Sequence, residues 1–234
     1  MTPLLKTNVD ICGKRGLGDL VSGTSHILQK LDNDTHLTYW LPPGFNYSET
    51  IQQIIDQYTR NFHLNITYSV DESWSSVSYK KALLKFNAAE ENILWFFNEG
   101  NNPVGYNLKF NTVWQGNKNG PVGLCLNNEN TNPGYPYPEK WFDKTINDFL
   151  LKLVDNKNYY FLGRPRTITE NIDIMSKCRY ILGTDGGWMH VANSMRVPAY
   201  LVRNGLSLKI IKATHIQHPT LKIIETKDFC KYLN

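Results

Sequence analysis

A glycine-rich turn, Thr184-Asp185-Gly186-Gly187, joins an apolar run that starts at Ile181 to a short predicted helix that carries His190. Val197-Pro198 and a second apolar run follow, so the segment has the pattern of a strand–helix–strand unit. A turn of this kind directs free backbone N–H groups and the positive end of a helix at a ligand. These residue types and their spacing therefore predict an anion site, in most cases a phosphate site.

A second glycine-rich loop follows the first apolar run of the chain. It reads Gly13-Lys14-Arg15-Gly16-Leu17-Gly18-Asp19 and opens a predicted helix over residues 19–31. Glycines let the backbone approach a ligand closely, and Lys14 and Arg15 are cations that suit a phosphate. Asp19 has two interpretations: it caps the helix, or it accepts a proton from a hydroxyl group within hydrogen-bond reach. A helix N-terminus favours the ionised form that such a base requires.

Neither loop has the spacing of the common nucleotide-binding fingerprints. The G-x-G-x-x-G pattern with a downstream acidic residue is missing, which argues against a small dinucleotide-dependent oxidoreductase. No Lys-Ser or Lys-Thr pair follows the first loop, which argues against a P-loop kinase or ATPase. The sequence has no His, Asp and Glu cluster with metal-ligand spacing, so neither a metal nor a cofactor is expected.

Apolar runs alternate with amphipathic segments along the chain, and this alternation predicts an α/β fold with parallel sheets. The predicted strands are Val9–Cys12, Leu37–Leu41, Leu64–Val70, Ile93–Phe97, Val122–Leu126, Tyr159–Leu162, the two runs that flank the His190 helix, and Leu221–Ile224. The predicted helices cover residues 19–31, 51–58, 79–86, 139–154, 168–178 and 227–233.

The irregular stretch Asn98–Gly120, rich in Asn and Gly, separates two such series, although Leu108–Trp114 within it also fits a strand. Each series has a glycine-rich turn after an apolar run. We therefore predict two Rossmann-like lobes that face a cleft, over residues 1–118 and 119–234.

Together the two glycine-rich segments resemble glycosyltransferase family 9, the heptosyltransferase-like enzymes. LGTDGGWMHVANSMRVPAYLV resembles the C-terminal-lobe motif of that family, and GLGDLVSGTSHILQKL resembles its first loop, with Gly18-Asp19 at the matching position. The matching residues of the first motif are Asp185, Gly187, His190, Ala192 and Pro198. Gly186 stands where Ser or Thr is usual.

The resemblance implies a GT-B-like architecture, with an acceptor-side N-terminal lobe and a C-terminal lobe that binds a nucleotide-sugar. Asp19 then inherits the role of catalytic base, and Lys14, Arg15, Gly16 and Gly18 form the loop around it. Asp185, the backbone of Gly186, Gly187 and Trp188, and the side chain of His190 are expected to hold the donor. Backbone amides and basic side chains stabilise the leaving nucleoside diphosphate in this scheme, so it needs no metal.

One cation of the family pattern is missing. Members often carry a lysine before a Trp-Pro in the loop after the first strand of the C-terminal lobe, and Pro136 occupies that place here. Arg164 and Arg166, which follow the Tyr159–Leu162 run, are the expected substitutes, unless they only face solvent. Two further alternatives stay open: His190 contacts the donor or is structural, and Trp188 stacks on a base or packs in the core.

Composition sets the remaining expectations. The chain of 234 residues has a net charge of +4, which suits an anionic partner without indicating nucleic-acid binding. No apolar run reaches the length of a membrane span, and the first residues lack a signal-peptide core, so a cytoplasmic protein of a bacterial or phage-infected cell is expected. The scattered cysteines Cys12, Cys125, Cys178 and Cys230 are expected to be buried free thiols.

Three functions stay open at this point. The first is an inverting glycosyltransferase with an ADP-heptose-like donor and a glycan or glycolipid acceptor of the lipopolysaccharide-core type. The second is a phage DNA glycosyltransferase that modifies hydroxymethylated bases, with Lys14, Arg15, Lys80, Lys81 or the basic C-terminal segment on the DNA phosphates. The third is a nucleotide-sugar-binding protein without catalytic activity.

Overall fold

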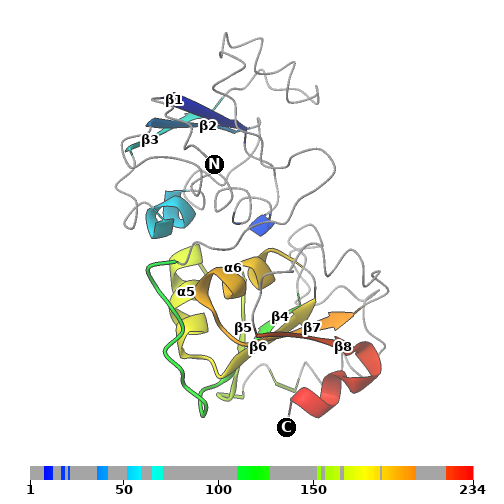
Figure 1. Cartoon of the computed structure of the whole chain (residues 1–234). Helices are drawn as coiled ribbons and strands as arrows, with labels where there is room; N and C mark the ends of the chain where they lie inside the picture. The colour runs from blue at the N-terminus through cyan, green and yellow to red at the C-terminus, as the bar shows by residue number, and fades with distance from the viewer. Residues whose placement is uncertain are drawn as a thin grey trace. The chain divides into compact units, whose positions relative to one another are not determined.

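The computed structural model describes the following parts of the chain: residues 8–12, 17–18, 21, 36–41, 52–58, 65–70, 110–126, 152–153, 156–163, 166–184, 186–203 and 220–233 (Figure 1). The chain divides into two compact units, residues 1–111 and 112–234. The predicted boundary after residue 118 falls within the second unit. Backbone hydrogen bonds from Trp114 N to Met195 O (3.0 Å) and from Gln115 N to Ser176 O (3.1 Å) attach the intervening segment to that unit.

The first unit contains a parallel sheet of three strands in the order β1-β2-β3. These strands are β1 (Asn8–Cys12), β2 (His36–Leu41) and β3 (Asn65–Val70), which lie close to the predicted apolar runs. Residues 52–58 are helical, as the spacing of their apolar positions predicts, and bury Ile54, Ile55 and Tyr58. The Tyr58 ring meets the ring of Phe110 edge-on at 4.8 Å between centroids.

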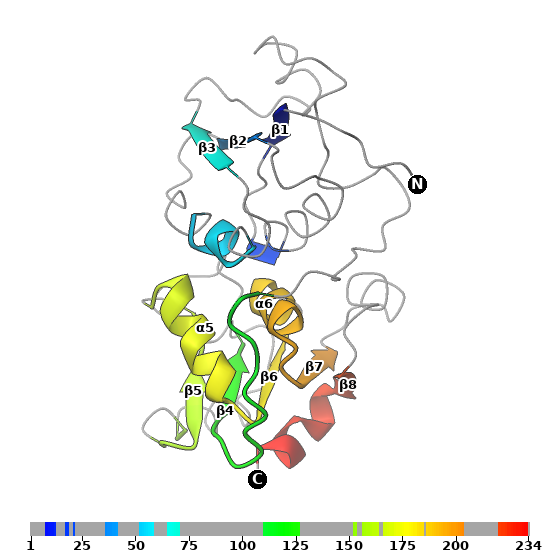
Figure 2. The same ribbon diagram turned by 60° about the vertical axis from the view of Figure 1, so that its left-hand side comes forward.

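The second unit contains a parallel sheet of five strands in the order β5-β4-β6-β7-β8 (Figure 2). The strands are β4 (Val122–Cys125), β5 (Tyr159–Phe161), β6 (Tyr180–Thr184), β7 (Ala199–Arg203) and β8 (Leu221–Glu225). Two α-helices are described, α5 (Ile168–Lys177) between β5 and β6, and α6 (Gly187–Met195) between β6 and β7. All these elements lie within a few residues of their predicted positions.

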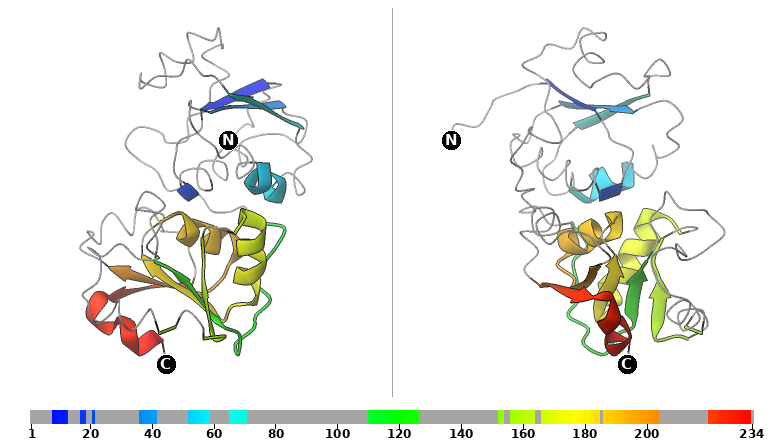
Figure 3. Two further views of the ribbon diagram at one scale, coloured as in Figure 1. Left: turned by 180° about the vertical axis from the view of Figure 1, so that it is seen from behind. Right: turned by 90° about the vertical axis from the view of Figure 1, so that its right-hand side faces the viewer.

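The five-stranded sheet is covered on both faces, as a parallel sheet requires (Figure 3). One face packs a cluster that includes Val122, Leu124 and Leu182 against Phe229 of the 3₁₀ helix η2 (Thr226–Tyr232). The C-terminal helix predicted at Lys227–Leu233 is therefore present, but as a 3₁₀ helix. The other face packs against α5 and α6, and there Cys125 Sγ lies 3.3 Å from Met189 Sδ of α6.

Two glycines allow close packing between the adjacent strands β4 and β6. A Cβ on Gly183 of β6 would lie 2.1 Å from Cys125 Sγ and 2.4 Å from Cys125 O on the neighbouring strand β4. A Cβ on Gly123 of β4 would lie 2.6 Å from Ile181 Cδ1. All three distances are shorter than real Cβ contacts. A side chain at Gly183 would force the backbone to shift because it meets the Cys125 carbonyl, whereas one at Gly123 first meets the flexible end of the Ile181 side chain.

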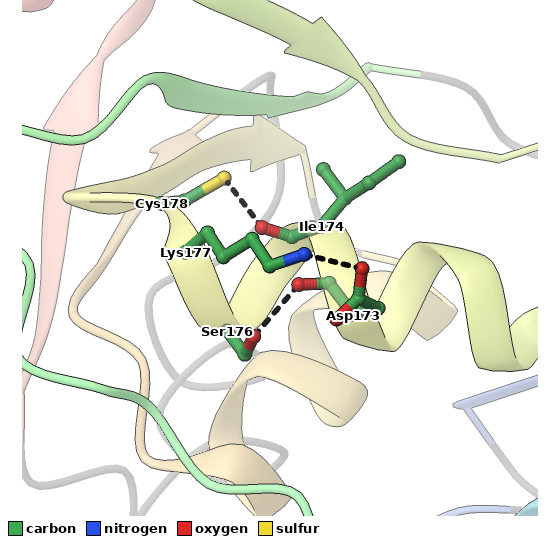
Figure 4. A network of polar contacts seen from close by, with 5 residues as sticks. All are labelled: Asp173, Ile174, Ser176, Lys177 and Cys178. Atoms are coloured by element: carbon green, nitrogen blue, oxygen red, sulfur yellow. Dashed lines mark hydrogen bonds and ion pairs between the residues drawn. The ribbon is translucent and has the colours of Figure 1, made fainter.

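Polar contacts stabilise the C-terminal end of α5, which lies at the edge of the sheet where the strands begin. Lys177 Nζ lies 2.6 Å from Asp173 Oδ2, Ser176 Oγ donates to Asp173 O (2.7 Å), and Cys178 Sγ lies 3.3 Å from Ile174 O (Figure 4). The indole Nε1 of Trp114 donates to Cys178 O at 2.7 Å. Residues 110–114 form no strand. The strand considered at Leu108–Trp114 is therefore absent over these residues, whose main chain bonds to helices instead.

Candidate functional site

The order of the strands marks one position on the second sheet as a ligand site. Counted from β4, the order is 2-1-3-4-5, so the chain leaves β4 for β5 on one side and for β6 on the other. In open parallel sheets, ligands bind beyond the carboxyl ends of the strands at this switch point. The turn after Thr184 and the start of α6 lie at the carboxyl end of β6, directly beside β4. The predicted phosphate turn therefore lies at the switch point.

Among the described residues, no side chain caps the N-terminus of α6. Its N-cap residue is Gly186, which is fully extended (φ 177°, ψ 177°) and supplies no side-chain capping hydrogen bond, and the first turn holds no acidic residue. The N–H groups of Gly187 and Trp188 precede the first full helical repeat and have no acceptor within the helix. Aligned peptide dipoles add positive potential at the same point. This end of α6 is thus suited to a phosphate group.

The N-terminus of α5 lies at the same edge of the sheet but is satisfied by its own residues. Thr167 Oγ1 accepts a hydrogen bond from Glu170 N (3.2 Å), and Glu170 Oε2 accepts one from Thr167 N (2.7 Å). These two bonds form a capping box. Hydrogen bonds from Thr167 lower the pKa of the Glu170 carboxyl, so a negative charge already stands at this helix end at neutral pH. An anion is therefore expected at α6 rather than at α5.

A buried amide fixes the loop between β5 and α5. Asn171 is fully buried, and its Oδ1 accepts a hydrogen bond from Gly163 N at 2.9 Å. Its Nδ2 lies within hydrogen-bond distance of three carbonyl oxygens, those of Gly163 (3.2 Å), Arg166 (3.3 Å) and Thr167 (2.8 Å). One side chain therefore links Gly163, at the start of this loop, to Arg166 and Thr167 at its end. Sequence reasoning did not find Asn171.

A signal for Asn171 does exist in the sequence. Ile168, Ile172 and Met175 form the buried stripe of α5, and Asn171 lies on that stripe at helical spacing. A polar residue among apolar positions of a helix indicates that buried backbone groups nearby need a partner. The Thr167–Glu170 pair likewise has the T-x-x-E spacing of a capping box, a pattern that the sequence alone displays.

The structure describes one of the two arginines that are predicted to bind a phosphate. Arg166 Nη1 donates to Phe161 O at 2.7 Å, which holds the guanidinium at the carboxyl end of β5. Arg166 is exposed, and its guanidinium carries further N–H donors beside the one bonded to Phe161 O. Arg164 lies outside the described residues. The role of both arginines in neutralising a phosphate stays a prediction.

Trp188 and His190 are both buried in the second unit. Their exposed fractions are 3% and 6%. The burial of the Trp188 ring favours packing over an exposed stacking surface for a base. The backbone N–H of Trp188 belongs to the first turn of α6. The predicted contact between this N–H and the donor does not depend on the ring, so the burial of the ring does not affect that prediction.

The N-terminal part of the predicted site is described only at Gly18. Leu17 and Gly18 are helical, so the helix includes a glycine that the sequence assigned to the loop. Asp19, Lys14, Arg15 and Gly16 lie outside the described residues, as does Asp185 in the second unit. Their expected roles stay predictions.

The two described cysteines that are buried, Cys125 and Cys178, are unsuited to nucleophilic chemistry at neutral pH. Burial raises the pKa of the Cys125 thiol far above its ordinary value, and burial also raises the pKa of Cys178, to about 12. Cys230 is exposed, which corrects the expectation that every cysteine is buried. In the part of the chain that the structure describes, no three His, Cys, Asp or Glu side chains lie together as metal ligands would.

The chain matches no protein-family model, and no curated protein is significantly similar to it in sequence. Among solved structures, it is similar to a glycosyl transferase of family 9 from Veillonella parvula DSM 2008, with a TM-score of 0.51 and 13% sequence identity. The similarity covers 99% of this chain and 89% of the other. At this identity the likeness shows the fold alone, and it confirms the predicted α/β architecture with parallel sheets. No helix within the described ranges is long and apolar enough to cross a membrane.

Proposed function

We propose that this protein is a glycosyltransferase that moves a sugar from a nucleotide-sugar donor to an acceptor hydroxyl group. The observation that carries the proposal is the uncapped N-terminus of α6 at the switch point of the five-stranded sheet. A diphosphate is the common element of nucleotide-sugars, and this helix end presents the N–H groups and the positive potential that bind one. The similarity of the fold to a family 9 glycosyl transfer enzyme supports the same conclusion.

On the donor side, the diphosphate binds to the N–H groups of Gly187 and Trp188, with Asp185, Gly186 and His190 around it. Arg166 and Arg164 supply positive charge from the loop after β5. Together these groups stabilise the charge that develops on the leaving nucleoside diphosphate, and the proposed reaction therefore needs no metal ion.

On the acceptor side, Asp19 acts as the general base. Its carboxylate accepts the proton of an acceptor hydroxyl as the hydroxyl oxygen forms a bond to the anomeric carbon. The bond from that carbon to the diphosphate oxygen breaks, and the nucleoside diphosphate leaves with the electron pair. A single displacement of this kind inverts the anomeric configuration. By resemblance to the heptosyltransferase-like enzymes, we propose an ADP-heptose-like donor and a lipopolysaccharide-core-like acceptor.

The proposal is tested by measuring nucleoside diphosphate release from a panel of nucleotide-sugars in the presence of EDTA. Wild-type protein should turn over one donor with a glycan acceptor, whereas Asp19→Asn should bind that donor equally well and lose turnover by about 100-fold or more. Donor binding with normal turnover by Asp19→Asn would exclude Asp19 as the base. Donor binding without turnover by the wild type, on glycan or on hydroxymethylated DNA, would instead indicate a protein that only binds nucleotide-sugars.

A further inference from the structure

The indole N–H of Trp188 is a buried hydrogen-bond donor whose acceptor is not supplied by the described residues. The side chain is 3% exposed, and Nε1 has no hydrogen-bond partner within the described ranges. Tryptophan can only donate at this atom, so the missing partner is an oxygen or another acceptor. A buried donor without a partner is costly, which makes an acceptor from a ligand a direct way to satisfy it.

The space beside this N–H is bounded by a glycine. Gly163 has φ +119°, a backbone conformation that favours glycine, and a Cβ built on it would lie 3.6 Å from Trp188 Nε1. Apart from Gly163 and its two chain neighbours, the described residues place no second atom within 4 Å of that Cβ position. Asn171 fixes Gly163 through its N–H and C=O groups, so the glycine has a defined place beside the indole.

The places of Trp188 and Gly163 in the fold connect them to the proposed diphosphate site. Gly163 follows β5, α6 follows β6, and β4 lies between these two strands. Neighbouring strands are about 4.8 Å apart, so the carboxyl ends of β5 and β6 are separated by roughly 10 Å. The Trp188 side chain starts in the first turn of α6 and reaches Gly163, two residues beyond the end of β5. A nucleotide-sugar whose diphosphate lies on α6 is long enough to extend over this distance.

We infer that the Trp188 indole N–H donates a hydrogen bond to a hydroxyl oxygen of the donor substrate next to its diphosphate, in a subsite bounded by Gly163. The inference rests on the proposed function, because it assumes that the diphosphate binds at α6. Both groups that flank the diphosphate, the ribose of the nucleoside and the transferred sugar, carry such hydroxyl oxygens. Trp188 is thus assigned a binding role through its side chain in addition to its backbone.

Trp114 offers a matched control within the same chain. Its indole Nε1 donates to Cys178 O at 2.7 Å, so the protein itself supplies the acceptor. Trp188→Phe and Trp114→Phe each remove one indole N–H and retain an aromatic ring. The first should impair ligand binding and the second should lower thermal stability, because it leaves the Cys178 carbonyl without its partner.

The experiment titrates wild-type protein and both variants with inorganic pyrophosphate, with adenosine, uridine and guanosine diphosphates, and with their sugar derivatives. Trp188→Phe should raise the Kd of the nucleoside diphosphate or of its sugar derivative about 5- to 10-fold and leave that of pyrophosphate unchanged. A change with the nucleoside diphosphate indicates the ribose, and a change with the sugar derivative alone indicates the transferred sugar. Trp114→Phe should leave every Kd unchanged.

Equal affinities of wild type and Trp188→Phe, or an equal loss for pyrophosphate, would overturn the inference while the proposed function stands. Wild-type protein that binds no nucleotide or nucleotide-sugar would overturn both. If Trp188→Phe does not fold, ¹⁵N-labelled wild-type protein replaces it, with the indole resonances assigned from the other tryptophan variants. The Trp188 Nε1–H resonance should then move downfield on addition of the bound nucleotide or nucleotide-sugar, and an unmoved resonance would contradict the inference.

Discussion

Asn171 binds the backbone of Gly163 on both sides of the residue, with Oδ1 2.9 Å from the glycine nitrogen and Nδ2 3.2 Å from its carbonyl oxygen. The same amide also lies within hydrogen-bond distance of Arg166 O and Thr167 O. A loop between a strand and a helix usually satisfies its backbone with water. Here a buried side chain does so, and it links the position of Gly163 to Arg166 and to the start of α5.

Removal of this amide should destabilise the second unit strongly. Asn171→Ala leaves a buried N–H group and carbonyl oxygens of the loop without their partner, and we expect a loss of about 2–3 kcal/mol in the free energy of unfolding. The measurement is urea denaturation followed by circular dichroism. Asn117→Ala is the matched control, because the Asn117 amide is exposed. Its Nδ2 donates to Lys177 O (3.2 Å) and its Oδ1 accepts from Asn119 N (3.2 Å), and the loss of these exposed bonds should cost less than about 1 kcal/mol. Equal losses in the two variants would contradict the assigned role of Asn171.

Gly183 should not tolerate a methyl group. A Cβ there would lie 2.1 Å from Cys125 Sγ and 2.4 Å from Cys125 O, so Gly183→Ala should cost about 3 kcal/mol or more in the same assay. The double variant Gly183→Ala with Cys125→Ala should recover only part of the loss, because the contact with the carbonyl oxygen persists. Full recovery would mean that the thiol alone requires glycine. Gly186→Ala is the tolerated comparison, since the nearest atom that its Cβ would meet among the described residues beyond its chain neighbours is Thr184 O at 4.0 Å.

The capping box of α5 should make stability depend on pH in the acid range. The pKa of Glu170 is lower in the folded protein than its ordinary value of 4.5, chiefly through the hydrogen bond from the Thr167 backbone. The folded state therefore binds fewer protons, so the contribution of Glu170 is present above pH 4.5 and is lost as pH falls through the lowered pKa. Thermal unfolding of wild type and Glu170→Gln should differ most near pH 7 and converge toward pH 3. Curves that stay parallel over this range would show that Glu170 does not carry the effect.

The sequence predicts the second unit well because its strands are short apolar runs bounded by glycine, proline or polar residues. Each described strand of that unit lies within a residue or two of its apolar run, and α5 ends at Lys177 rather than at Cys178. The strand order, in contrast, does not follow from the sequence. Nothing in the local pattern of β4, β5 or β6 determines which strands become neighbours, so the switch point beside Thr184 is known only from the fold.

The sequence shows the glycine turn before α6, but it does not show the side chain that supports the neighbouring loop. The turn at Gly186-Gly187 is visible because glycines before a helix are distinctive. Asn171 was not assigned a role, because its value depends on three-dimensional contacts with Gly163 and with the residues after it. For Trp188 the sequence left open whether the ring stacks on a ligand or packs in the core. Its burial, with Nε1 close to Gly163, is a property of the folded chain.

The most direct test of the central claim compares two substitutions at Gly186, where the extended backbone and the open space allow a side chain. Aspartate and asparagine are equally good N-caps, so Gly186→Asp and Gly186→Asn should both fold with nearly wild-type stability. Only aspartate places a negative charge beside the proposed diphosphate, at a Coulomb cost of several kcal/mol at an effective dielectric of about 20. In calorimetric titration with the nucleoside diphosphate that binds best, Gly186→Asp should lose affinity at least tenfold relative to Gly186→Asn. Equal affinities in the two variants would contradict a diphosphate site at the N-terminus of α6.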